Sequence, residues 1–118
     1  MLITLERFAA YACARDAFTA IARATATWPP DLAAHAKTIA SNILAKTAEA
    51  NDQDPTSPAR RKCLRDAIVD ALVLASLCDL ASSHGLTSDD LNDSLRHASR
   101  TISMLGLSFH ATSAANDE

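Results

Sequence analysis

Residues 55–86 have the sequence PTSPARRKCLRDAIVDALVLASLCDLASSHGL, and this stretch decides the fold. Ser57 is a residue type that caps a helix N-terminus, and Pro58 suits the first helical position because its missing N–H would be unpaired there. Gly85 suits the end of a helix, where a left-handed backbone conformation costs glycine least. No glycine or proline occurs between Pro58 and Gly85. The stretch therefore predicts a long helix over 58–83.

The same two residue types divide the rest of the chain, which holds only two glycines and four prolines in 118 residues. Pro29 and Pro30 separate the first segment from the second, and a polar stretch over 51–57 separates the second from the third. The pattern predicts helices at about 3–26, 31–50, 58–83 and 88–109, and a disordered polar tail over 110–118. We expect one domain over 1–109, an all-α, antiparallel up-down four-helix bundle.

The composition predicts an aliphatic core of small residues, because hydrophobic content is 48% but aromatics are only 4%. The net charge of −3 argues against a protein that coats nucleic acid. Three cysteines cannot all pair within one chain, and none has C-x-x-C spacing, so we expect reduced thiols. No basic leader and no apolar run of about 20 residues is visible. These features predict a cytoplasmic protein that crosses no membrane.

Large apolar residues at helical spacing mark the expected inner face of each helix. A Thr-Ser-Asp-Asp stretch over 87–90 resembles a capping box that starts at Thr87, with aspartate in place of the usual glutamate. The expected inner residues are Phe8, Tyr11, Ala14, Phe18, Ile21 and Ala22 in the first helix, Leu32, Ala36, Ile39 and Ile43 in the second, and Leu91, Leu95, Ala98, Ile102, Leu105 and Phe109 in the fourth.

The third helix carries two apolar stripes, whereas a surface helix of a monomer needs only one. The second stripe predicts either contact with another subunit or a skewed bundle that buries this helix centrally. Contact between subunits is the favoured interpretation. The first stripe comprises Leu64, Ile68, Leu72 and Ala75, and the second, which gives the candidate interface residues, comprises Val69, Val73, Leu77 and Leu80.

The sequence shows no catalytic apparatus. The Glu-x-x-His pairs that hold di-iron centres in four-helix bundles are missing. A cluster at the start of the fourth helix suggests a surface metal site, but acidic residues in a first helical turn normally complement the helix dipole. The cluster comprises Asp89, Asp90, Asp93 and His97. We expect no catalytic residue, no metal, no cofactor and no small-molecule substrate.

The basic residues Arg60, Arg61, Lys62 and Arg65 form the candidate site for an anionic partner. They lie in the first turns of the third helix, where positive charge opposes the helix dipole. The phosphates of RNA or DNA, the acidic residues of the preceding loop or a neighbouring subunit would each compensate for this charge. A solvated or salt-bridged face is the other interpretation.

The segment around His35 resembles a histidine phosphotransfer domain, which is also a four-helix bundle of about this size. The matching residues are Ala34-His35 and Lys37. The resemblance implies a signalling domain in which His35 accepts the phosphate, and we keep this as the alternative function. However, side chains two residues apart on a helix point about 200° from each other, so Lys37 does not support a phosphate on His35.

A second resemblance covers most of the chain. It rests on Tyr11, Trp28-Pro29, Ser41-Asn42-Ile43, Arg60-Arg61-Lys62, Gly85-Leu86 and Ile102-Ser103-Met104-Leu105, in that order. In this order and spacing the chain resembles the small four-helix-bundle family of the 23S rRNA intervening-sequence protein and the accessory proteins of diversity-generating retroelements. It departs from them at Leu44-Ala45-Lys46, where the family has an Ala-Glu-Gly-like motif.

This resemblance implies a homo-oligomeric ring of five bundles. The nucleic-acid or reverse-transcriptase binding of the retroelement members rests on a basic surface, from which this acidic chain departs. We therefore expect a non-enzymatic, self-assembling bundle, with a pentamer favoured, that acts as a structural or interaction module. An RNA or nucleoprotein partner for the four basic residues is an extension of that expectation.

Overall fold

The computed structural model describes the backbone of residues 8–117 and the side chains of residues 8–112. All regular secondary structure in this part of the chain is helical, and it contains no strand. The helices are α2 (Ala9–Ala24), which ends in the 3₁₀ turn η1 (Thr25–Thr27), α3 (Pro30–Asp52), α4 (Pro58–Ser83) and α5 (Asp89–Asp117). The predicted all-α fold with four helices is confirmed, and residues 3–7 of the predicted first helix lie outside the described residues.

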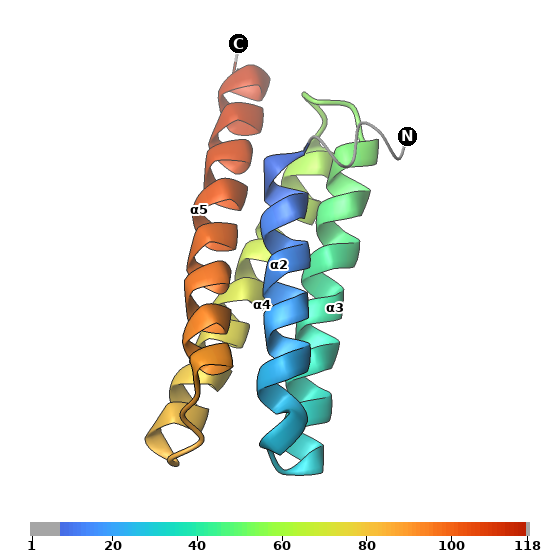
Figure 1. Ribbon diagram of the computed structural model, residues 1–118. Helices are drawn as coiled ribbons and strands as arrows, with labels where there is room; N and C mark the ends of the chain where they lie inside the picture. The colour runs from blue at the N-terminus through green and yellow to red at the C-terminus, as the bar shows by residue number, and fades with distance from the viewer. Residues whose placement is uncertain (1–7, 118) are drawn as a thin grey trace.

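The four helices form a bundle in which successive helices run in opposite directions (Figure 1). α2 packs against α3 and α5, and α4 packs against the same two helices from the other side. The bundle is elongated, with extents of 49 × 26 × 21 Å. Each helix therefore keeps one long side outside the bundle.

Local backbone chemistry fixes both ends of α4. The Ser57 hydroxyl accepts a hydrogen bond from the Arg60 N–H at 3.1 Å, which confirms the predicted N-cap. Gly85 has a φ of +82°, and its N–H donates to the Ser82 carbonyl at 3.0 Å. The Leu86 N–H donates to the Ala81 carbonyl at 3.0 Å. These two bonds form a Schellman motif, in which glycine supplies the left-handed residue.

Two predictions about α5 are wrong. The tail predicted over 110–118 is helical as far as Asp117. No helix breaker follows Gly106, and the buried Thr112 packs this last part of α5 onto the bundle. The N-cap is Ser88 and not Thr87, because the Ser88 hydroxyl accepts the Leu91 N–H at 3.0 Å.

Small residues fill the core, and more than half of the buried apolar residues are alanines. In α3 and α4 the buried positions alternate three and four residues apart, which is the seam of a left-handed bundle. The seam of α2 has the same spacing, with Cys13 and Ala20 buried beside it, and the seam of α5 has it as far as Leu105. Small side chains at such a seam let the helices approach closely. The seam residues are Ala10, Ala14, Ala17, Ile21 and Ala24 of α2, Ala33, Ala36, Ala40, Ile43, Thr47 and Ala50 of α3, Leu64, Ala67, Ala71, Leu74, Cys78 and Ala81 of α4, and Leu91, Ser94, Ala98, Thr101, Leu105 and Thr112 of α5.

The large residues predicted for the inner faces mostly flank this seam. Ile21, Ile43, Leu91 and Leu105 are fully buried as predicted. The four aromatic side chains predicted for the inner faces and several leucines and isoleucines are only half-buried, and Ala22 is exposed. The half-buried set comprises Phe8, Tyr11, Phe18, Leu32, Ile39, Leu95, Ile102 and Phe109.

Hydroxyl groups occupy several seam positions without leaving an unpaired donor. The hydroxyls of Thr47 and Thr101 each donate to the carbonyl four residues earlier, at 2.7 Å. Ser94 makes the same contact with the Asp90 carbonyl at 2.8 Å. This pairing within the helix lets a small polar side chain stand where alanine would otherwise be needed.

Candidate interaction surface

The outward side of α4 is an apolar strip. Val69 is 52% exposed, Leu72 51%, Val73 36% and Leu80 47%. Leu77 is half-buried at the edge of the same strip. Grouped exposure of large apolar residues on a monomer marks a candidate interaction site. We call these five residues the α4 strip.

The structure separates the two stripes that the sequence predicts for this helix. The helix turns its seam residues inward, and Leu64 and Leu74 are completely buried there. Leu72, which the sequence pattern places on the inner stripe, belongs to the outward face instead. The bundle does not bury Val69, Val73 or Leu80, so a skewed bundle does not account for the second stripe. Contact with another subunit stays a prediction.

One end of the α4 strip opens into a small apolar recess between α3 and the α4–α5 turn. Its volume is about 150 Å³. Because Leu80 belongs both to the recess and to the strip, the two form one continuous apolar surface. The recess is lined by Pro29, Leu32, Leu80, Ala81, His84 and Leu86.

Arg60 is occupied within the bundle, unlike the other three residues of the basic cluster. Its Nη1 donates to the Ala50 carbonyl at 2.8 Å, and its guanidinium lies 5.4 Å from the centre of the Phe8 ring. The first contact places a cation at the C-terminal end of α3, where the helix dipole favours it. The second is a cation–π contact. The sequence groups Arg60 with the other cations as a site for an anionic partner, but these contacts give it a structural role.

The remaining cations, Arg61, Lys62 and Arg65, line a shallow recess of about 120 Å³ together with Pro58. None of the three forms an ion pair with a carboxylate among the side chains of residues 8–112. We call these three residues the α4 cations. They are therefore cations without an ion-pair partner within the described part of one chain.

The acidic loop before α4 forms no ion pair with the α4 cations among the described side chains. The Asp54 carboxylate accepts hydrogen bonds from the Thr56 N–H and hydroxyl, each at 3.0 Å. These two bonds lower the pKa of Asp54. Solvation, the phosphates of a nucleic acid and a neighbouring subunit are the remaining ways to balance the charge of the α4 cations.

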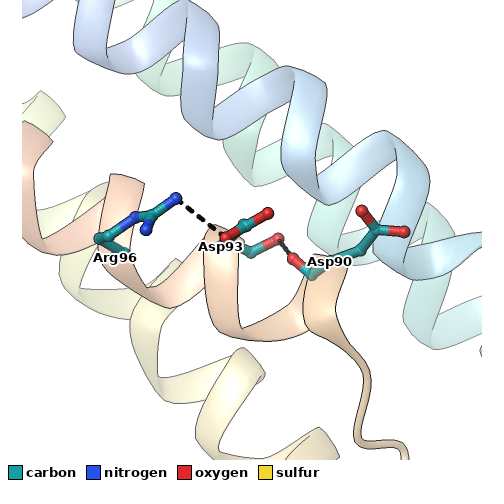
Figure 2. Close-up of polar contacts among 4 residues, drawn as sticks. Asp90, Asp93 and Arg96 are labelled. Carbon is teal, nitrogen blue, oxygen red and sulfur yellow. Dashed lines mark hydrogen bonds and ion pairs between the residues drawn. The ribbon is translucent and has the colours of Figure 1, made fainter.

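A polar groove of about 160 Å³ lies between α2 and the start of α5. Figure 2 shows the Asp90 carboxylate on the side of α5 that faces α2, and the ion pair between Asp93 and Arg96, which are 2.9 Å apart. Both paired side chains are largely exposed, so the pair contributes little to stability. No group of three His, Cys, Asp or Glu side chains within residues 8–112 is arranged to hold a metal ion.

The candidate phosphoacceptor His35 is exposed on α3, and so is Lys37. No hydrogen bond or ion pair within the described side chains links His35 to another group. The phosphotransfer function stays a prediction from the sequence.

The three cysteines are free thiols in unreactive surroundings. Cys13 and Cys78 are buried, and Cys63 is half-buried. Burial raises the pKa of Cys78 to about 11. The pKa of Cys63 is also raised, first by burial and then by the Glu49 carboxylate. Both thiols are therefore protonated at neutral pH.

We expect a maleimide at about pH 8 to modify Cys63 before Cys78. With a pKa of about 11, only about one Cys78 side chain in a thousand is a thiolate at that pH, and that thiolate is buried. Mass spectrometry of the peptides after timed labelling measures the order. Cys63→Ser should remove the fast phase, whereas modification of native Cys78 as fast as in urea would contradict this expectation.

Comparison of the chain with protein-family models, with curated proteins and with solved structures finds no match. Among the described residues, no helix has both the length and the apolar character that crossing a membrane requires.

Proposed function

We propose that the protein is a non-catalytic interaction module that associates with other copies of itself through the α4 strip. The exposure of Val69, Leu72, Val73 and Leu80 on one side of one helix is the observation that carries the proposal. Removing apolar surface from water is favourable by roughly 25 cal/mol per Å². A second copy supplies a matching apolar surface without requiring any other protein.

The ring of five that the family resemblance implies would join the α4 strip of one copy to a different surface of the next copy. The three free cysteines support a reducing compartment, so we place the protein in the cytoplasm as part of the same proposal. Contact between the α4 cations and RNA is a second candidate, favoured by the lack of described carboxylates paired with them.

Sedimentation velocity over a wide range of protein concentration tests self-association. We expect the natural protein to form species heavier than the 12.5 kDa monomer. Val73→Glu should weaken assembly by about 100-fold, since it places an unpaired charge in the contact. Its helical circular dichroism should be unchanged, because Val73 lies outside the core.

Ser103→Glu is the matched control, because Ser103 is exposed on α5 and the substitution adds the same charge away from the strip. It should assemble like the natural protein. A natural protein that is monomeric at every concentration, or a Val73→Glu variant that assembles normally, would overturn the proposal.

A further inference from the structure

The charged residues along the α4 strip point to one arrangement of two copies. We infer that two chains pair antiparallel through α4, related by a two-fold axis that passes close to Leu72 and Val73. The inference rests on the proposed function, in which the α4 strip binds a second copy. It adds the orientation and the register of the pair.

The described surface offers one patch of grouped large apolar residues. Of the exposed large apolar residues in the described part of the chain, only Leu107 lies outside α4. An open or cyclic assembly joins two different surfaces of the molecule, whereas a two-fold pair uses the same surface twice. The α4 strip therefore supplies both halves of a two-fold contact, and residues 8–112 present no second patch of that kind for a ring.

Opposite charges lie on α4 at equal distances before and after Leu72. Arg65 lies seven residues before Leu72, and Asp79 lies seven residues after it. Both charged residues are exposed, and residues seven apart lie on nearly the same side of a helix. An antiparallel pair centred on Leu72 brings Arg65 of each copy beside Asp79 of the other. A parallel pair would instead place like charges together.

The positive charge at the start of α4 has no ion-pair partner within the described chain. Arg61 and Lys62 lie at the positive end of their own helix dipole, and within the described chain no carboxylate pairs with them. In an antiparallel pair they lie beside the negative C-terminal end of the other copy's α4, where cations are favoured. Pairing thus compensates for a charge that the single bundle leaves unpaired.

The pair should be weak. At 1.5 Å per residue, the part of α4 from Arg65 to Leu80, which contains the α4 strip, is about 22 Å long. One helix of this length buries less than the roughly 800 Å² per partner of a standard interface. We expect a dissociation constant in the micromolar range or above, so measurements must reach concentrations of hundreds of micromolar.

Charge reversal tests the register. Arg65→Asp and Asp79→Arg should each weaken pairing about tenfold, and the double variant should recover to within about threefold of the natural protein, because both ion pairs re-form with exchanged signs. Sedimentation equilibrium measures the dissociation constants, and circular dichroism verifies the fold. Loss of pairing in the single variants without recovery in the double variant would overturn the inference.

Cysteine cross-linking tests the axis independently, in a Cys63→Ser background. Leu72→Cys should oxidise to a covalent dimer with itself. Arg65→Cys should form a covalent dimer only when mixed with Asp79→Cys. A covalent species larger than a dimer, or efficient Arg65→Cys dimers without the second variant, would contradict a two-fold antiparallel pair.

Two outcomes distinguish this inference from the proposed function. If Val73→Glu abolishes association but both charge reversals leave it unchanged, the strip binds another copy in a different arrangement, and only the inference fails. If Val73→Glu has no effect, the proposed function fails. If the charge reversals change only the binding of a single-stranded RNA oligonucleotide, the α4 cations serve RNA and the inference is overturned.

Discussion

Ala40→Leu should destabilise the bundle by about 1–3 kcal/mol, because it forces extra side-chain volume into a closely packed seam. Ala40 is 1% exposed, whereas Ala45, further along the same helix, is exposed. Ala45→Leu makes the same chemical change outside the seam and should alter the free energy of unfolding by no more than about 0.5 kcal/mol. Urea denaturation followed by circular dichroism compares the two variants. Equal effects at the two positions would show that the seam has room for larger side chains.

Leu74→Ala should lower the free energy of unfolding by about 2–5 kcal/mol, since it removes a buried side chain and leaves a cavity. Leu74 is completely buried, and Leu72 on the same helix is 51% exposed. Leu72→Ala should therefore cost less than about 0.5 kcal/mol when the protein is dilute enough to be monomeric. Urea denaturation at low protein concentration measures both variants.

The two leucine variants also test which side of α4 faces the core. A loss at Leu72 comparable to that at Leu74, measured in dilute solution, would mean that Leu72 is buried in the single chain. The α4 strip would then lose one of its central residues.

The number and order of the helices could be predicted because local chemistry determines where each one stops. Gly85 adopts the left-handed conformation, and Ser57 caps α4 through its own hydroxyl. Neither depends on distant parts of the chain. The prediction for the end of α5 is wrong because polar residues after Phe109 indicate a tail only where a helix breaker accompanies them, and none is present there.

The inner faces could be predicted only in part. The sequence pattern gives weight to large apolar residues, so it assigns Tyr11 and Phe18 to the buried side of α2. The closely spaced helices instead bury Ala10, Ala14 and Ala17, and the aromatic rings cover the edges of the seam. Alanine is common on both sides of a helix, so sequence alone gives little sign of which alanines face inward.

For the candidate interaction surface, too, features that depend on one helix could be predicted, and features that depend on contacts between separate segments could not. The surplus of apolar residues on α4 is visible in the sequence, because it depends on one helix alone. The different role of Arg60 among the four cations is not visible in the sequence. It depends on contacts with Ala50 and Phe8, which the fold brings close to Arg60.

The alanine-rich seam also affects how stability varies with temperature. Unfolding hydrates apolar surface, and the heat capacity of unfolding grows with the apolar area exposed. An alanine side chain contributes one methyl group to that area, much less than a leucine or a phenylalanine. A low heat capacity change flattens the curve of unfolding free energy against temperature. We therefore expect the stability of the bundle to change little over a broad temperature range.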